Sequence, residues 1–446
     1  MEIILIKAAQ LILSLSLLVV IHEFGHFMFA RLFKTRVEKF YLFFDPWFSL
    51  FKVKKGDTEY GVGWLPLGGY VKISGMIDES MDKEAMKLPA QPYEFRAKKT
   101  WQRLLIMVGG VFMNFILAFI LYIAVLYAWG ESYLPTANVK YGIEVDSVGL
   151  KIGLQNGDKI LSVDNMQVEN FRKVIPTVLL EKARNIQVER AGQKIDVEIS
   201  DDDLALLMNS KGVLSYRVPF DYVIAKLPKD SPAKEAGFQV NDQILGLDSL
   251  KYEFLDQFKR ALQNSKGKKV SIIVLRDKKE IRIPMVVPQT GLLGMELNGM
   301  EISKIFELKT IEYSLIESIP AGFEHGLSTI SDYLKGLKLI FSPKTKAYES
   351  LGGFIAIGNI FPGAWSWYDF WNMTAFLSII LGVMNLLPIP ALDGGHVMFL
   401  LFEMITGRKP GDKFLEYAQI AGMVLLLSLV LFANGNDLFK LWKQYF

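Results

Sequence analysis

The sequence predicts a polytopic membrane protein with four transmembrane helices, a short β element beside the membrane, and two tandem α+β domains between the second and third spans. Three observations predict this fold class: four long apolar runs, a stretch rich in Gly and aromatic residues in the first loop, and a twelve-residue pattern that occurs twice. Hydrophobic residues make up 51% of the 446-residue chain. Their clustering into runs therefore decides the class of protein.

The apolar runs are free of charge or nearly so, and each approaches or exceeds the roughly 20 residues that cross a bilayer as a helix. They cover Ile3–Ile21, interrupted only by Lys7, and then Leu104–Trp129, Phe370–Leu392 and Tyr417–Asn436. We expect transmembrane helices within residues 1–30, 101–130, 369–396 and 414–446. The first run lacks a basic opening and a small-residue cleavage site, so we expect a retained helix rather than a signal peptide.

Composition excludes several classes of protein. The net charge of +3 is small for this length, and no basic stripe interleaved with aromatic residues suggests a nucleic-acid partner. The chain has no cysteine, which excludes disulfides, thiol chemistry and a Cys-built metal site. A metal would have to be held by His and carboxylate side chains.

The distribution of Lys and Arg predicts the orientation of the chain. The short segments between the first and second spans and between the third and fourth, residues 31–100 and 397–413, are rich in both and should stay in the cytoplasm. Both termini and the long segment between the second and third spans would then lie outside. Lys440 and Lys443 argue weakly against this orientation.

The first loop contains a candidate β element. Thr58–Ile73 is rich in Gly, aromatic and β-branched residues, which predicts two short strands joined at residues 66–69. Two interpretations stay open. The element is either an ordinary hairpin, or an open strand edge dipping towards the membrane, on which an extended substrate could be added.

The outer segment contains an internal repeat. Residues 153–164 align with residues 237–248 and share Gly, Gln, Asp, Ile, Leu and Asp, which predicts sister domains over residues 131–216 and 217–300. Each copy resembles a PDZ domain of bacterial proteases. Such domains capture a peptide C-terminus by strand addition. Neither copy shows an obvious Gly-Leu-Gly-Phe loop, so peptide capture and a spacer or size-filter role both stay open.

Residues 301–368 complete the outer segment. Apolar residues at helical spacing from Lys309 to Phe341 predict an amphipathic helix on the outer membrane surface, broken at Pro320. His325 is interpreted as a surface histidine within it. Residues 351–368 contain too many Gly and Pro residues for a continuous fifth span.

The motif that organises the chain is His-Glu-Phe-Gly-His at residues 22–26, at the end of the first apolar run. On a helix, His22 and His26 project from one face and can grip one metal ion. Glu23 lies beside the metal without being a ligand, where it can take a proton from a metal-bound water. Ionisable groups that extend a hydrophobic span are costly and usually functional.

Two histidines leave a catalytic zinc one protein ligand short. Asp393 extends the third run just after Pro388 and Pro390, which should break the helix. Because the first and third spans cross in the same direction, His22 and Asp393 should reach a compatible depth, about 28 and 34 Å of helix into their runs. The alternative is a plain helix end with residues 394–395 as its C-cap. His396 could support the site from outside the ligand set.

Together these motifs resemble the site-2 protease family of membrane-embedded metalloproteases, in particular its sigma-E-regulating branch. The similarity includes Asn-Leu-Leu-Pro-Ile-Pro-Ala-Leu-Asp-Gly-Gly at residues 385–395 and covers essentially the whole chain. The resemblance implies one zinc ion held by His22, His26 and Asp393, with Glu23 as general base. It further implies substrate contacts from Asn385 and from the β element, at Gly61, Gly63, Gly69 and Tyr70.

The same resemblance implies what the enzyme acts on and where it lies. Substrates would be single-pass membrane proteins, such as an anti-sigma factor already trimmed by a first protease, and remnant signal peptides. The chain would lie in the bacterial inner membrane with both termini and the PDZ-like domains in the periplasm. The active site would lie near the cytoplasmic side.

Two rivals come from other classes of function. A silent scaffold could keep zinc for structure, but a closed structural site has no use for Glu23. A metal or proton transporter would also place His and Asp residues in the membrane. It would need ionisable groups along a path, whereas these gather at one depth.

Overall fold

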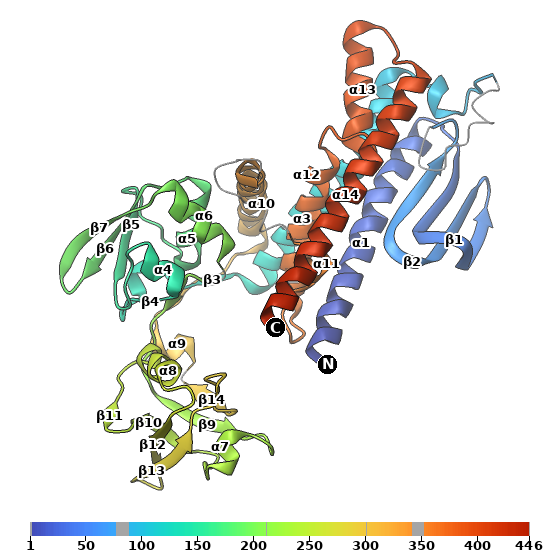
Figure 1. The fold of residues 1–446 in the computed structure, drawn as a ribbon. Helices are drawn as coiled ribbons and strands as arrows, with labels where there is room; N and C mark the ends of the chain where they lie inside the picture. The colour runs from blue at the N-terminus through green and yellow to red at the C-terminus, as the bar shows by residue number, and fades with distance from the viewer. Residues whose placement is uncertain (1, 77–88, 211, 300, 341–351, 446) are drawn as a thin grey trace. The chain divides into compact units, whose positions relative to one another are not determined.

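The structure is a computed structural model that describes residues 2–76, 89–210, 212–299, 301–340 and 352–445. It divides into two compact units (Figure 1). The first holds residues 1–131, 312–338 and 348–446, and the second holds residues 132–311 and 339–347. Parts of the predicted first loop (77–88) and of the predicted segment 301–368 (341–351) lie outside the described residues.

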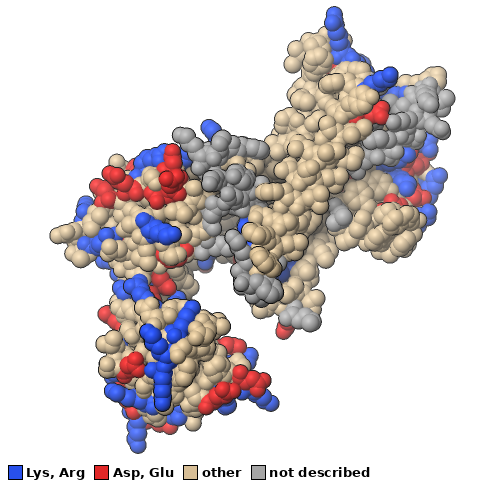
Figure 2. Space-filling view, viewed as in Figure 1, with Lys and Arg blue, Asp and Glu red and all other residues tan. Residues whose placement is uncertain are grey.

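The first unit is mainly helical. Its long helices are α1 (Glu2–Leu32), α3 (Thr100–Trp129), α10 (Leu315–Ile340), α12 (Trp367–Asn385), α13 (Asp393–Thr406) and α14 (Asp412–Tyr445), and its short ones are η1 (Phe95–Ala97) and α11 (Phe354–Gly358). Among the described residues, three helices are long and apolar enough to cross a membrane: Glu2–Leu32, Thr100–Trp129 and Lys413–Lys440. They coincide with the predicted first, second and fourth spans. Figure 2 shows few charged side chains over these helices.

The structure differs from the prediction for the third span. α12 is not among the three candidate spans, because polar residues such as Asp369 and Asn372 dilute its apolar character. It also ends at Asn385 rather than at Leu392. Residues 386–392 form a loop, since Pro388 and Pro390 cannot continue the hydrogen bonding of a helix. The expected connection at residues 397–413 is largely a second helix, α13.

α3 is the central helix of this unit and packs against α1, α12 and α13. α10 also packs on α3, in the opposite direction: Gly322 lies against Ile123, and Gly326, one turn later, lies against Phe119. Pro320 does not break α10 as expected. It stands near the start of the helix and removes a single backbone donor. His325 is half-buried against the Tyr122 ring, 4.6 Å between centroids, rather than on the surface.

The β element is formed by β1 (Val37–Lys55) and β2 (Thr58–Ile73), which pair antiparallel around a turn at Gly56. Residues 39–42 of β1 pair with residues 69–72 on one side and with residues 59–62 on the other. The two parts of β2 are therefore both extended, as predicted, but they are not paired with each other. Sequence reasoning did not predict β1. Its apolar and aromatic residues are as compatible with a loop beside the membrane as with a strand.

The second unit contains the two repeated domains. The first has β4 (Ile143–Val145) paired with β8 (Leu214–Tyr216), the sheet β5 (Lys159–Val163), β6 (Asn185–Arg190), β7 (Gln193–Glu198), and the helices α4 (Ser147–Lys151), η3 (Phe171–Lys173), α5 (Val174–Leu180) and α6 (Asp201–Asn209). The second has the strand order β13 (Lys279–Val286), β12 (Lys269–Arg276), β10 (Gln243–Leu247), β9 (Tyr222–Lys226), β14 (Glu296–Gly299), with β11 (Leu250–Lys251) on β10 and the helices α7 (Pro232–Glu235) and α8 (Leu255–Asn264). Beside the two domains lie η2 (Thr136–Asn138), α9 (Ile302–Ile305), and β3 (Glu131–Tyr133) paired with β15 (Lys309–Ile311).

The aligned residues of the repeat make the same hydrogen bonds in both domains. The buried Asp158 carboxylate accepts hydrogen bonds from Arg190, and the buried Asp242 carboxylate accepts them from Arg276. In each copy the Arg also donates to the carbonyl of the first glycine of the pattern. The shared residues of the repeat thus fix one local structure twice.

Candidate metal centre

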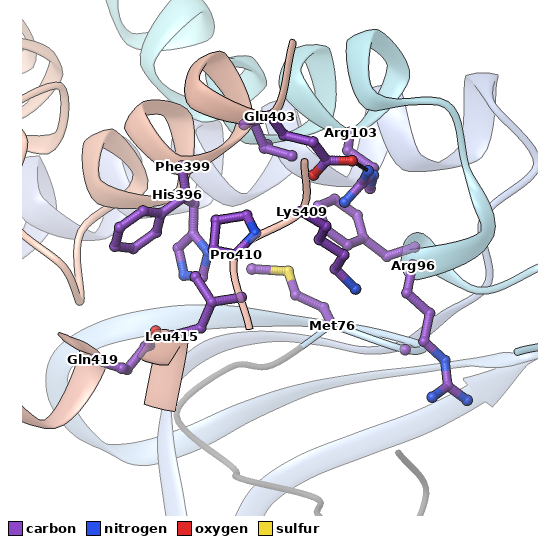
Figure 3. Close-up of a pocket in the computed structure, with 13 residues that line it drawn as sticks. Met76, Arg96, Arg103, His396, Phe399, Glu403, Lys409, Pro410, Leu415 and Gln419 are labelled. Atoms are coloured by element: carbon purple, nitrogen blue, oxygen red, sulfur yellow. Dashed lines mark hydrogen bonds and ion pairs between the residues drawn. The ribbon is translucent and has the colours of Figure 1, made fainter. Parts of the chain in front are cut away.

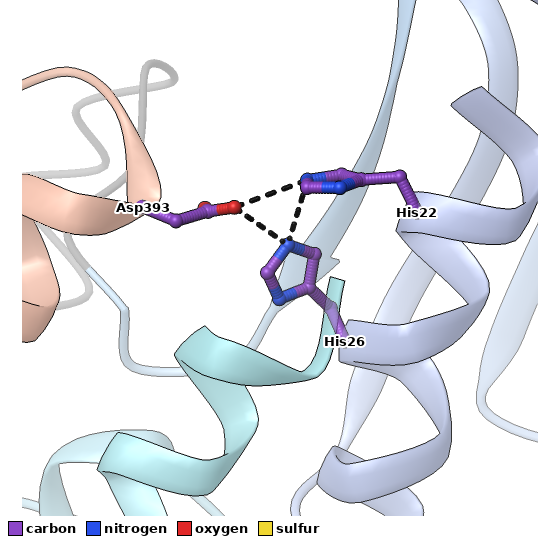
Figure 4. A group of neighbouring side chains, drawn as sticks. All are labelled: His22, His26 and Asp393. Atoms are coloured by element: carbon purple, nitrogen blue, oxygen red, sulfur yellow. Dashed lines mark hydrogen bonds and ion pairs between the residues drawn. The ribbon is translucent and has the colours of Figure 1, made fainter. Parts of the chain in front are cut away.

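The structure brings His22, His26 and Asp393 together (Figure 4). His22 and His26 stand one turn apart on α1, and both side chains are buried. Their Nε2 atoms lie 3.2 Å apart. The Asp393 Oδ2 atom lies 3.0 Å from His22 Nε2 and 3.3 Å from His26 Nε2. Three ligand atoms therefore converge on one point, although Asp393 lies more than 360 positions from the two histidines in the chain.

Asp393 reaches the histidines because the loop after α12 folds back over the start of α13. Asp393 is the first residue of α13, and Gly394 and Gly395 belong to its first turn, so they are not the C-cap of a preceding helix. A Cβ on Gly395 would stand 2.6 Å from the Ile389 carbonyl oxygen, and one on Gly394 would overlap the loop backbone. Ala391 has a φ of 91°, a strained conformation for a residue with a side chain.

α3 supports both imidazole rings from behind. His26 Nδ1 lies 2.8 Å from the Ile106 carbonyl oxygen, to which it can only donate. In the neutral ring, which is the form that binds a metal, the Nε2 atom of His26 then carries a lone pair. His22 Nδ1 lies 3.1 Å from the amide of Asn114. Gly110, between these two residues on the same face, leaves room for the rings, since a Cβ there would stand 2.5 Å from His26 Nε2.

The residues fit a divalent metal ion. The Asp393 Oδ2 atom is buried, and among the described residues its near polar neighbours are the Nε2 atoms of His22 and His26, with no other side-chain donor assigned to it. It faces two imidazole nitrogens, at least one of which presents a lone pair rather than a proton. Lone pairs packed at about 3 Å repel one another unless a proton or a metal cation lies between them, and three such atoms around one point favour a metal cation. Two His nitrogens and one carboxylate oxygen are a common ligand set of catalytic zinc, which keeps a fourth position open.

A cavity of about 660 Å³ opens in front of this group. Glu23 lines it beside the two histidines, half-buried and outside the ligand group. Gly69 and Tyr70 of β2 line it as well, and a Cβ on Gly69 would stand 3.6 Å from the Glu23 Cγ atom. His396 and Gln419 complete part of the wall.

The other predicted substrate contacts divide into two sets. Asn385 is the last residue of α12, and its Nδ2 atom lies 3.4 Å from His22 Nε2, so it reaches the centre. Gly61 and Gly63 do not line the cavity. They lie on the part of β2 across β1 from residues 69–72, against Tyr41 and Phe44.

A smaller pocket adjoins the cavity on the side of α13 (Figure 3). Met76, His396 and Gln419 line both spaces. At its far wall the buried Arg103 of α3 pairs with Glu403 of α13, which also accepts from the Thr100 hydroxyl. This ion pair ties the start of α3 to the helix that carries Asp393.

Sequence reasoning missed the residues of α3 that face the centre. Asn114 could have indicated this face of α3 from the sequence, because a polar amide in the middle of an apolar span is usually functional. Lys39 and Asp45, which line the cavity from β1, were also missed. They could not have been assigned without the strand that carries them.

A buried His-His-Asp group with an adjacent glutamate, whose two histidines lie on a helix long and apolar enough to cross a membrane, is the residue set of a membrane metallohydrolase. The chain belongs to peptidase family M50, whose profile matches residues 10–429. It is 28% identical to the regulator of sigma E protease of Haemophilus influenzae, over 96% of this chain and 98% of that protein. A Campylobacter jejuni protein, provisionally named a zinc metalloprotease, is 29% identical over 96% of this chain and 92% of its own length.

A third relative, from Rickettsia conorii, has the same provisional name. It is 27% identical over 97% of this chain and 98% of its own length. The protein is therefore a zinc metalloprotease of the membrane. The family and the apolar helices place it in the inner membrane.

Proposed function

We propose that the protein is an intramembrane endopeptidase that cuts single-pass membrane proteins. The observation that carries this proposal is the position of Glu23 and the His22, His26 and Asp393 group, which face one cavity among helices apolar enough to cross a membrane. A protease that cuts soluble chains has no need to bury its ligands on such helices.

The residues divide the chemistry between them. A bound zinc ion would polarise the scissile carbonyl and make water a better nucleophile. Glu23 is placed to accept the proton of the attacking water and to return it to the leaving nitrogen. The Asn385 amide, at the edge of the centre, is placed to donate a hydrogen bond to a substrate carbonyl.

The β element offers a place for an unwound substrate. Among the described residues, the segment 69–73 has a strand partner on one side only, and all of its residues line the cavity. A transmembrane helix hides its carbonyls in its own hydrogen bonds, so it must unwind before it is cut. Addition of the unwound segment to this edge would replace the lost bonds. Gly69 and Tyr70 are the contacts that this geometry favours.

The same element supports its placement at the membrane surface. Trp47 is 91% exposed, and its ring stacks on Trp64 with 6.1 Å between centroids. Phe48 stacks on the same ring, at 5.9 Å. Exposed tryptophans favour the membrane interface, where one end of the ring is apolar and the other is wet. In this proposal α12 completes a four-helix core, the termini face the periplasm, and the metal lies towards the cytoplasm.

The proposed substrate is an anti-sigma factor that another protease has already trimmed, and the name of the Haemophilus relative supports this choice. Remnant signal peptides form a second substrate class. The PDZ-like domains would bar an untrimmed substrate by their bulk. The alternative role, peptide capture, gains support from residues 291–294, Gly-Leu-Leu-Gly, which lie one residue before β14 at the edge of its sheet.

The test is cleavage of a single-pass substrate by the purified full chain in liposomes. Two forms of the substrate are compared, one trimmed close to the membrane and one with its outer domain intact. We expect cleavage of the trimmed form at a bond within the transmembrane segment, located by mass spectrometry, and little cleavage of the intact form. A cut only outside the membrane segment, or ion flux without cleavage, would refute the proposal.

A further inference from the structure

One face of α3 is built to hold the two imidazole rings. Ile106, Gly110 and Asn114 follow one another at intervals of four residues, so they lie in a row on the helix. This row faces His22 and His26, which have the same spacing on α1. Each histidine meets one polar group of the row, and Gly110 separates them.

Asn114 belongs to this row, but the ligand set described above gives its side chain no role. It is fully buried. Its Nδ2 atom lies 3.1 Å from His22 Nδ1, while its Oδ1 atom has no donor beside it among the described residues. The oxygen and nitrogen of such an amide are interchangeable by a half-turn, so the partner decides which atom faces the ring.

We propose that Asn114 is a positioning residue that fixes the tautomer and orientation of His22. Its Oδ1 atom accepts a hydrogen bond from Nδ1–H, which leaves the lone pair on Nε2, the atom that faces Asp393. This inference rests on the proposed ligand set. It assigns to Asn114 the role that the Ile106 carbonyl has for His26.

The opposite amide orientation has a different consequence. If Nδ2–H donated to Nδ1, the proton of His22 would lie on Nε2 and point at Asp393. That arrangement is a structural hydrogen bond and blocks a metal ion. The two orientations therefore predict opposite metal-binding behaviour for the same backbone.

The backbone of Asn114 is held independently of its side chain. The Ser378 hydroxyl of α12 donates to the Asn114 carbonyl oxygen at 2.7 Å. A change of the amide alone can thus alter the contact with His22 while the link between α3 and α12 persists. This separation makes the side chain testable.

The first experiment measures zinc affinity by chelator competition on the purified full chain. Asn114→Leu keeps the shape of the side chain but has no acceptor, and we expect about a 10- to 100-fold loss of affinity. Asn114→Asp restores an acceptor at either position and should bind zinc within a few-fold of the unchanged protein. Ser14→Ala is the matched control, because it removes a buried hydroxyl of α1 that accepts a hydrogen bond from Thr374 of α12 and does not contact the imidazole rings.

Equal affinity of the Leu variant and the unchanged protein would overturn the inference, and so would equal losses in the Leu and Asp variants. A second readout needs no variant. The chain has four histidines, so imidazole labelling gives a resolvable NMR spectrum. We expect Nδ1 of His22 to be protonated and Nε2 to carry the metal; a proton on Nε2 would overturn the inference. Absence of zinc binding in the unchanged protein would instead refute the proposed ligand set.

Discussion

Gly25 of α1 and Gly109 of α3 lie in backbone contact. A Cβ on Gly109 would stand 2.7 Å from the Gly25 carbonyl oxygen, and one on Gly25 would overlap the Gly109 backbone. Small residues let membrane helices approach this closely. Because Gly25 lies between His22 and His26, the contact sets how near α3 comes to the imidazole rings. The metal centre is therefore shaped by a helix that supplies none of its ligands.

We predict that Gly110→Ala disrupts zinc binding. The added methyl group would stand 2.5 Å from His26 Nε2 and 2.8 Å from His22 Nε2, so at least one ring must move. We expect at least about a tenfold loss of zinc affinity, as for other groups that orient metal ligands. Alanine favours helix by about 1 kcal/mol over glycine, so general helix instability cannot cause the loss.

The control for this change is Gly336→Ala in α10. Nothing lies within 4 Å of a Cβ at that position, so the same gain in helix propensity comes without a clash. Zinc affinity is measured for both variants by chelator competition. Retention of full affinity by the Gly110 variant would show that the rings do not depend on this approach.

We predict that Glu23→Gln abolishes cleavage and leaves zinc content unchanged. Glutamine keeps the shape of the side chain but cannot accept the proton of water at neutral pH. Since Glu23 lies outside the His22, His26 and Asp393 group, the metal should stay bound. Cleavage of the trimmed substrate and zinc per chain are measured on the same preparation. Cleavage that survives the change would assign the general base to another residue.

We predict that Asp393→Asn lowers zinc affinity more than Asp369→Asn does. Asp393 Oδ2 lies within 3.3 Å of both imidazole nitrogens, and a neutral amide oxygen there attracts the cation less. Asp369 stands in the first turn of α12, apart from the ligand group. Chelation of zinc from the unchanged protein should abolish cleavage, and added zinc should restore it. Equal zinc affinities of the two variants would exclude Asp393 as a ligand.

Sequence patterns were sufficient for those features that depend on local rules. The i, i+4 spacing of His22 and His26 places both rings on one face whatever surrounds the helix. The prolines at 388 and 390 end α12 because they lack a backbone donor. The pairing with Asp393 was predicted from the expected parallel course of the first and third spans, although Asp393 lies at the start of α13, beyond the loop that follows α12.

Other features depend on contacts between distant residues and could not be read locally. β1 is held in place by pairing with two parts of β2, one on each side. The sequence of β1 has no alternation of polar and apolar residues that would have predicted this pairing. The role of Gly110 appears only when α1 lies against α3. The fold of the loop over the start of α13, which presents Asp393 to the histidines, depends on glycines 394 and 395, whose lack of a side chain lets the loop approach the helix.

We predict that Gly422→Ala weakens the metal centre from outside it. Gly422 of α14 packs on the carbonyl group of Pro390, and a Cβ at this position would overlap that group. Pro390 lies three residues before Asp393, so α14 presses on the loop that carries the proposed third ligand. An added methyl group must displace either the helix or the loop. We expect a loss of zinc affinity and of cleavage, each by at least about tenfold.

Gly435→Ala is the matched control on the same helix, because nothing lies within 4 Å of a Cβ there. Both variants gain the same helix propensity, and both residues lie in the fourth predicted span. Only the Gly422 variant should lose zinc and activity, and the loss should shrink when Pro390→Gly makes the loop more adaptable. If the two glycine variants behave alike, the contact between α14 and the loop does not hold Asp393 in place.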